Sequence, residues 1–469
     1  MFCFYYVVRY NNTMTDQKLS IRFLGGAESV TGSNFMIEDE AGTQILIDCG
    51  LFQGCKICED ANRAPFTFDV TRVDVLIVTH AHLDHIGRIP KLVKDGFRGV
   101  IYSTPPTQEI AELSLLDSMG VMAKEARYDN VTPLYDEADV AASMRLWKTA
   151  EYHQPFSIGN FQAVFRDAGH VLGSAMVELT YNGKKIVFSG DLGNSPTPLL
   201  RDPEAITDAD YLVVESVYGD RNHEGRSERK EKLRTAIKDT INGGGTVMIP
   251  AFSIERTQEL LFEIENMMEE SELPLVPVFL DSPLAIEVTD IYKKYQSYFN
   301  KDARAIIREG DGIFHFPQLQ ITRTADESKA IRYAVPRKII IAGSGMSNGG
   351  RILHHEKIYL PDPKSSLILG GYQASGSLGR VIEEGAKSIT IHGEIIPVNA
   401  KIIVVSGYSG HKDSDGLVNF VANSASTLKK VFVAMGEPKS ASFLAQRLRD
   451  TLGLDATVPK EGDVITIQV

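Results

Sequence analysis

The sequence has few cysteines, no internal repeats and no long apolar segment at its start. Four cysteines in 469 residues are too few for a disulfide scaffold, so we expect a protein of the reducing cytoplasm. Cys55 and Cys58 have the spacing of half a zinc knuckle but no second pair, and we interpret them as a loop pair. The apolar residues 2–8 are too few to span a bilayer and lack a signal-peptide layout. Disulfide-rich and membrane-spanning classes are therefore disfavoured.

The chain also lacks an excess of positive charge. Its 49 Lys and Arg residues face 61 Asp and Glu residues, which gives a net charge of −12. A nucleic-acid enzyme with this balance must bind its substrate through a local basic groove, not through its whole surface. The length and the apolar fraction of 43% predict an ordinary globular protein of two domains. We expect residues 1–18 to be a disordered extension, with Met14 as an alternative start.

The strongest signal is a dense group of metal-binding side chains after an apolar run at 73–78. His80, His82, Asp84 and His85 follow that run, which is typical of a buried strand. Side chains alternate along an extended chain, so His80 and His82 can point the same way. Asp84 and His85 lie on the following turn and can face a second ion. Imidazole and carboxylate donors together suit zinc or a similar divalent metal. Such a spaced set is rare by chance, so a plain polar surface turn is the weaker interpretation.

Other candidate ligands also stand at predicted strand ends. A strand over 161–167 leads to His170, and a hairpin closed by Asn182 and Gly183 leads to Asp191. Asp48 follows another predicted strand, where a simple turn-forming role is equally compatible. A lone histidine or aspartate after a strand is usually structural, so position alone makes these residues candidates.

Residues 202–385 alternate between predicted strands and helices, which indicates a mostly parallel sheet. Within this region we expect Ser253 to cap a helix that starts at Ile254. The segment 386–469 carries His411 and is expected to return to the first domain.

The motif His-x-His-x-Asp-His after a strand resembles the signature of the metallo-β-lactamase fold. From about Leu19 onward, the other motifs resemble its nucleic-acid-processing branch, the β-CASP nucleases. The resemblance implies an α/β fold, in which an αββα sandwich of residues 19–201 and 386–469 holds an inserted α/β β-CASP domain at 202–385. It also implies a ribonuclease, endo- or exonucleolytic, that hydrolyses RNA phosphodiester bonds with a two-metal-activated hydroxide in the cleft between domains.

The resemblance further implies roles for single residues. His80, His82 and His170 would hold one zinc ion, Asp84 and His85 the second, with Asp191 bridging; manganese is an alternative metal. Asp48 would support the metal-binding loop through hydrogen bonds. Asp84 and His411 would be catalytic, His411 as the general acid whose pKa is raised by hydrogen bonding to the third catalytic residue, Glu215. The implied RNA contacts are Ser253, Arg256, Ser344, Arg351 and Ser377, although a helix-surface salt bridge is an equally compatible role for Arg256.

One position departs from the family pattern. Met435 stands where the family usually places a metal-binding histidine, and a thioether is a poor ligand for zinc. The second site is therefore expected to be partly occupied. The alternatives to a ribonuclease are a weakened RNA-binding homologue or complex subunit, and a DNA-directed nuclease of the same superfamily. RNA is the expected partner, a homodimer is compatible with the sequence, and no membrane association is expected.

Overall fold

The computed structural model describes residues 18–469 except 54–55, 130, 309–312, 372 and 374–375. The expectations for residues 1–17 and for Cys55 lie outside the described residues. Lys18 already belongs to the first strand, β1.

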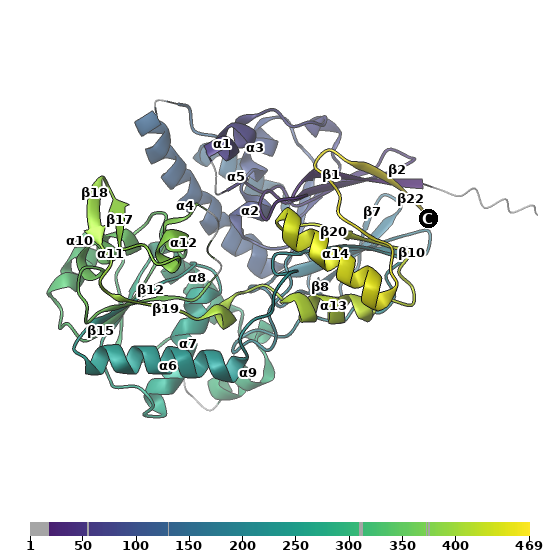
Figure 1. The fold of residues 1–469 in the computed structure, drawn as a ribbon. Helices are drawn as coiled ribbons and strands as arrows, with labels where there is room; N and C mark the ends of the chain where they lie inside the picture. Colours follow the sequence, from purple (N-terminus) through teal and green to yellow (C-terminus); the bar gives the residue numbers. More distant parts are fainter. Residues whose placement is uncertain (1–17, 54–55, 130, 309–312, 372, 374–375) are drawn as a thin grey trace, which may run out of the picture.

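Two seven-stranded sheets form the larger lobe of the molecule (Figure 1). The first has the order β22 (Val464–Gln468), β1 (Lys18–Gly25), β2 (Asn34–Asp39), β3 (Gln44–Ile47), β4 (Val75–Ile77), β5 (Val100–Ser103), β6 (Trp147–Thr149). The second has the order β21 (Ala456–Thr457), β20 (Lys430–Val433), β11 (Tyr211–Val214), β10 (Lys184–Phe188), β9 (Ala175–Tyr181), β8 (Phe161–Asp167), β7 (Phe156–Ile158). Because β22 pairs with β1, the end of the chain completes the sheet that its beginning starts.

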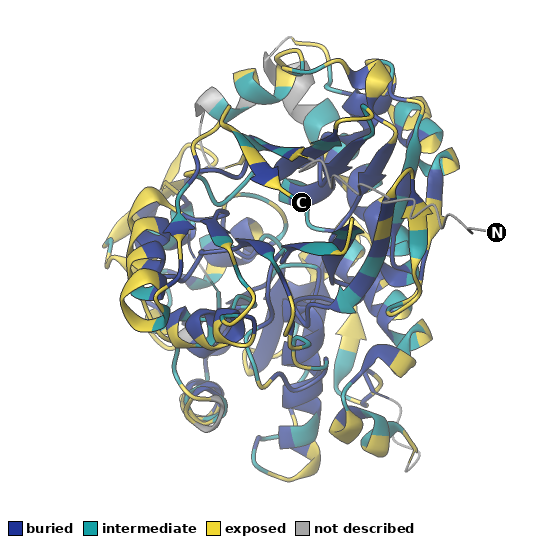
Figure 2. Ribbon diagram, turned by 90° about the vertical axis from the view of Figure 1, so that its right-hand side faces the viewer, coloured by how far each residue is buried: buried dark blue, intermediate teal, exposed yellow. Residues whose placement is uncertain are grey.

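Strand alternation explains how the two sheets pack. On β10, Ile186 and Phe188 enter the apolar cluster between the sheets, whereas Val187 faces the opposite side. That opposite side is covered by α13 (Ser414–Ala422) and α14 (Pro438–Leu452). The outer face of the first sheet packs against α3 (Ile89–Lys94), α4 (Pro105–Asp129) and α5 (Glu137–Arg145). The predicted αββα sandwich is confirmed. Figure 2 shows interior strands mostly buried and the outward faces of the surface helices exposed.

The smaller lobe contains a six-stranded sheet in which every pair is parallel, as expected from the alternating strands and helices. Its order is β14 (Leu319–Ile321), β13 (Val278–Asp281), β15 (Lys338–Ala342), β12 (Thr246–Pro250), β16 (Ser366–Leu369), β19 (Lys401–Val404). Its helices are α6 (Arg226–Asn242), α7 (Arg256–Glu269), α8 (Pro283–Lys294), α9 (Lys301–Arg308), α10 (Ala325–Ala330), α11 (Ile352–Tyr359) and α12 (Leu378–Glu383). Since β19 pairs with β16, this sheet continues past residue 385, where we expected the inserted domain to end.

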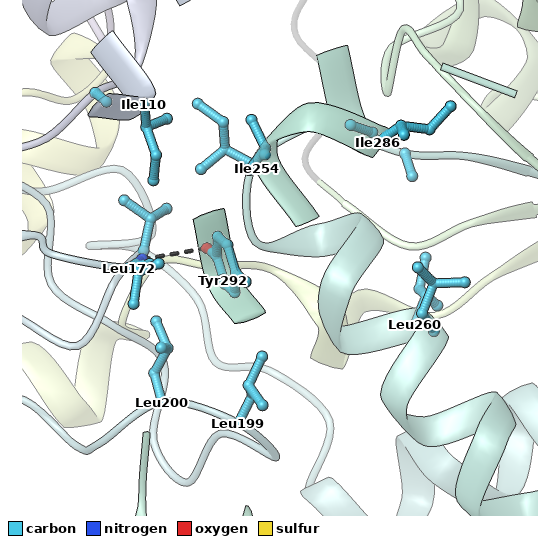
Figure 3. Packing of buried hydrophobic residues seen from close by; sticks show 14 of the residues in the cluster. Ile110, Leu172, Leu199, Leu200, Ile254, Leu260, Ile286 and Tyr292 are labelled. Carbon is cyan, nitrogen blue, oxygen red and sulfur yellow. Dashed lines mark hydrogen bonds between the residues drawn. The ribbon is translucent and has the colours of Figure 1, made fainter. Parts of the chain in front are cut away.

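The two lobes share one apolar cluster (Figure 3). Leu172 and Leu200 from the larger lobe pack in it with Ile254 and Tyr292 from the smaller one. The Leu172 amide donates a hydrogen bond to the Tyr292 hydroxyl over 3.2 Å, so the contact is polar as well as apolar. This contact begins two residues after His170 and therefore lies directly beside the candidate site.

No helix in the described part of the chain is both long and apolar enough to cross a membrane.

Candidate active site

The candidate site lies where several strands end at one edge of the sandwich. β10 and β11 are parallel, so Asp191 and Glu215, which follow them, emerge side by side. β8 runs antiparallel to β9, which runs antiparallel to β10, and His170 after β8 therefore emerges at the same edge. His80 and His82 follow β4 of the facing sheet. Residues far apart in sequence meet here because the strands share a direction.

Three imidazoles and one carboxylate converge tightly. His82 Nδ1 lies 3.0 Å from His80 Nε2 and 3.3 Å from His170 Nε2. Asp191 Oδ2 lies 3.5 Å from both of those Nε2 atoms. Burial, the largest effect, lowers the pKa of His82 to about 3 and holds the pKa values of the other two histidines well below the ordinary one. Neutral rings with converging lone pairs are the donor set that a divalent cation requires.

A second group of unsatisfied atoms lies beside the first. His85 Nε2 and Asp191 Oδ1 are 3.4 Å apart, both are buried, and neither has a hydrogen-bond partner among the described residues. Asp84 Oδ2 lies 3.8 Å from the same nitrogen. A buried polar atom without a partner is costly, so this gap fits a cation held by His85, Asp84 and the shared carboxylate. Asp84 and His85 stand on a short helix, α2 (Leu83–Ile86), and not on the turn that we expected.

Asp48 organises this loop from below. Its carboxylate accepts hydrogen bonds from the Thr79 amide over 2.8 Å, the Thr79 hydroxyl over 2.9 Å and the Ser33 hydroxyl over 3.1 Å. It also lies 2.7 Å from His85 Nδ1, which fixes the ring so that Nε2 points at Asp191. These bonds provide the loop support that the resemblance implied for Asp48.

His411 and Glu215 form a second pair against Asp191. His411 Nδ1 lies 3.2 Å from Glu215 Oε2 and 3.8 Å from Asp191 Oδ2. Burial opposes the charged ring, but the two carboxylates outweigh it and raise the pKa of His411 to about 9. Glu215 Oε1 is held by the Leu192 amide over 2.6 Å. The three side chains also have the spacing of a metal-binding group, so geometry alone permits either an acid or a ligand role for His411.

A cavity of about 530 Å³ opens over these residues, and both lobes contribute to its walls. Four of the five predicted RNA contacts line it together with His82, Asp84, His170, Asp191 and His411: these four are Ser253, Arg256, Ser344 and Ser377. Arg351 does not line it. Its guanidinium donates to Asp281 Oδ1 over 2.7 Å and to the carbonyls of Thr322 and Arg323 over 2.9 and 2.8 Å. The fifth prediction is therefore corrected, since these three hydrogen bonds turn Arg351 toward the sheet.

Ser253 is not a helix cap. Helix α7 begins only at Arg256, and its N-cap is Glu255 at φ +64°. Ser253 Oγ instead lies 3.2 Å from Ser282 Oγ at the edge of the cavity. Arg256 is buried and its guanidinium pairs with Glu259 one turn along the helix, so the salt bridge considered for it exists but is not on the surface.

Met435 packs as an apolar side chain. It is buried in the cluster between the two sheets, directly after β20, and its amide donates to the Gly26 carbonyl over 2.6 Å. It adopts φ +45° and lines a small cavity with Asp48 and Glu215. Met435 therefore lies near Asp48, which supports the histidine-bearing loop, and near Glu215, which pairs with His411.

Sequence reasoning missed His223 and Tyr408. His223 Nε2 lies 3.0 Å from the His411 carbonyl oxygen, and the Tyr408 hydroxyl contacts Glu263 on α7. Neither lies in a strand-end motif. The only available signal was their closeness in sequence to residues already singled out.

Comparison with known proteins agrees with this geometry. Family models match three successive stretches: the metallo-beta-lactamase superfamily over residues 30–251, the Beta-Casp domain over 257–382, and the Zn-dependent metallo-hydrolase RNA specificity domain over 395–459. The chain belongs to the metallo-β-lactamase superfamily, in the branch that carries a Beta-Casp domain. The resemblance seen in the sequence is thereby confirmed, and with it the capacity for a divalent metal.

Several curated proteins are similar over most of their length. A ribonuclease of Thermus thermophilus is 37% identical over 90% of this chain and 94% of its own. An RNase J-like protein of Methanocaldococcus jannaschii is 34% identical over 95% of this chain and 99% of its own. A transcription termination factor of Methanosarcina mazei is 32% identical over 94% of this chain and 71% of its own. In a crystal structure, a protein of unknown function from Enterococcus faecalis has the same fold, with a TM-score of 0.54 at 11% identity, over 96% of this chain and all of its own.

Proposed function

We propose that this protein is a ribonuclease that hydrolyses RNA phosphodiester bonds with two zinc ions in the cavity between its lobes. The observation that carries the proposal is the convergence of His80, His82, His170 and Asp191 beside the unpartnered atoms of His85 and Asp191. Three neutral imidazoles would hold one ion, and Asp84 with His85 the other. When bound, such a metal pair supplies a nucleophile from water near neutral pH and stabilises charge on the phosphate.

The side chains of this chain would perform the proton chemistry. His411 presents Nδ1 to Glu215 and lies on the cavity wall, where Nε2 would serve the substrate. With a pKa of about 9, the ring holds a proton at neutral pH and can pass it to the departing ribose oxygen. Glu215, held by the Leu192 amide, would keep the ring oriented during this transfer.

RNA is the substrate that the relatives support. The Thermus relative is named a ribonuclease and the Methanocaldococcus relative an RNase J-like protein, and a model of an RNA specificity domain matches residues 395–459. Ser253, Ser344 and Ser377 would contact the RNA backbone from the smaller lobe. Ser377 caps α12, accepting a hydrogen bond from the Arg380 amide over 3.2 Å, and lies on the cavity wall. A homodimer and a cytoplasmic location stay predictions.

The test compares RNA with DNA. Purified protein is incubated with end-labelled RNA and DNA of one sequence, with and without a chelator, and with zinc or manganese added back. We expect cleavage of RNA that the chelator stops and zinc restores, and no cleavage by His80→Ala. Binding of RNA without cleavage would support the weakened homologue instead, and preferential cleavage of DNA would support a DNA-directed nuclease.

A further inference from the structure

We propose that His223 is a positioning residue for His411, acting through a hydrogen bond from its ring to the His411 backbone carbonyl. The proposal rests on the proposed nuclease function and adds a residue to it. His223 lies in the segment 218–223, between β11 and α6, and does not line the cavity. It therefore acts on the chemistry only through its partner.

The hydrogen bond defines the tautomer of His223. Its Nε2 lies 3.0 Å from the His411 carbonyl oxygen, and a carbonyl can only accept, so Nε2 must carry the proton. The His223 and Tyr218 rings pack in an edge-type contact, with centroids 4.2 Å apart and ring planes at 61°. The His223 amide also donates to Asp413 Oδ2 over 3.2 Å. The imidazole is thus held from two sides with its N–H directed at the loop that carries His411.

The segment that carries His223 is joined to the His411 loop at several further points. Tyr218 forms a parallel bridge with Asp413, and the Ser414 amide donates to the Arg221 carbonyl over 3.0 Å. Asn222 and Asp415 exchange two hydrogen bonds of 2.7 and 3.1 Å. These contacts fix the two segments against each other, so a donor at position 223 has a defined place relative to His411.

The backbone on the other side of His411 is held by the core of the site. The Gly410 carbonyl lies 3.0 Å from His170 Nδ1 and accepts from the Asn194 amide over 3.1 Å. The Lys412 amide donates to the Leu192 carbonyl over 2.8 Å. The Lys412 amide and the His411 carbonyl belong to the same peptide group, which is therefore held at its N–H by Leu192 and at its carbonyl by His223. That carbonyl helps to set the backbone of His411, and hence whether its ring meets Glu215 at 3.2 Å.

Two substitutions of His223 distinguish the effect of its N–H donor from the effect of its aromatic ring. His223→Phe keeps a planar ring against Tyr218 but has no N–H, whereas His223→Gln keeps an N–H within reach. His354→Phe, on the exposed surface of α11 outside the cavity, is the matched control. All variants are checked for bound zinc and for thermal unfolding.

The activity readout uses two leaving groups. RNA loses a ribose oxygen that needs a proton, whereas bis(p-nitrophenyl) phosphate loses a phenolate that leaves without one. We expect His223→Phe to lower kcat on RNA by about 10- to 100-fold, within the range of general-acid catalysis, at unchanged KM. Cleavage of the activated diester should change less than about threefold. His223→Gln should recover most of the RNA activity, and the control should match the wild type. Equal losses on both substrates, or loss of zinc, would assign His223 a purely structural role.

A second readout does not depend on cleavage. The proton that His411 Nδ1 shares with Glu215 should give a low-field imidazole proton resonance, assigned by its loss in His411→Asn. We expect this resonance in the wild type and in His223→Gln, and its shift or loss in His223→Phe. An unchanged resonance in His223→Phe would overturn the inference. If the wild type shows the resonance but cleaves no RNA, the proposed function fails while the positioning of His411 is still measured.

Discussion

Arg351→Met is expected to destabilise the smaller lobe without weakening RNA binding, because Arg351 faces Asp281 and not the cavity. Asp281 is fully buried and accepts four hydrogen bonds, from Arg351 over 2.7 Å, His355 over 2.7 Å, Thr322 over 2.7 Å and Ser328 over 2.6 Å. Removing the guanidinium also frees two backbone carbonyls.

The magnitude follows from these contacts. Removing one partner of a buried ion pair costs about 3–5 kcal/mol. Here Asp281 keeps three donors, and the Arg351 side chain is 19% exposed, so water replaces part of the loss. We therefore expect the free energy of unfolding to fall by ~2–3 kcal/mol. Methionine fills a similar volume, so little stability is lost by leaving an empty cavity.

Two assays on three variants test this reasoning. Urea unfolding gives the stability, and equilibrium binding of RNA to chelated, inactive protein gives the affinity. Arg323→Met is the control for a lost arginine, since its pair with Asp290 is exposed and should contribute below about 1 kcal/mol. Ser253→Ala, at the cavity edge, should weaken RNA binding at nearly unchanged stability. If Arg351→Met weakened RNA binding as strongly and left stability intact, our correction of its role would be refuted.

Four further outcomes are expected. His411→Ala should slow RNA cleavage by about 10²–10⁴-fold at unchanged zinc content, and loss of zinc would instead make His411 a ligand. Elemental analysis of mildly purified protein should find zinc, and Asp84→Ala should lower both metal content and activity. Met435→His should tighten the second metal and speed cleavage at limiting zinc, and identical metal titrations of the two proteins would show that the imidazole is dispensable. Hydrogen bonds from His355, Ser328 and Thr322 outweigh burial and lower the pKa of Asp281 to about 2 from 3.8, so ~2.5 kcal/mol of stability should be lost as pH falls from about 4 to 2. Acid unfolding of Asp281→Asn should lack that component.

The cluster of histidines around Asp191 could be predicted from sequence because its signals are local. His80 and His82 follow one strand, two residues apart, so alternation lets their side chains point the same way. Asp191 follows the second strand of a hairpin whose Asn182-Gly183 turn is a strong local signal. Parallel pairing of β10 with β11 then brings Glu215, which only the family resemblance singled out, beside Asp191.

The errors arose where a distant contact overrode a local pattern. Arg351 follows a glycine-rich loop typical of phosphate contacts, yet its partner Asp281 stands at the end of another strand. Ser253 precedes an apolar, helix-forming run, but Glu255 takes a left-handed conformation and delays the helix to Arg256. β19 belongs to the smaller sheet because it pairs in parallel with β16. Its own short sequence does not indicate which strand it will pair with.

The order of the strands in the two sheets has a consequence for protein synthesis. Asp191 and Glu215 leave the ribosome before the smaller lobe, whereas His411 leaves it after that lobe, and β22 pairs with β1 later still. The histidines and Asp191 are therefore synthesised before the Gly410 carbonyl, which lies 3.0 Å from His170 Nδ1, and before His411, the proposed proton donor. The site can therefore be completed only after the smaller lobe has been synthesised, so its assembly must follow that of the lobe inserted into the sandwich.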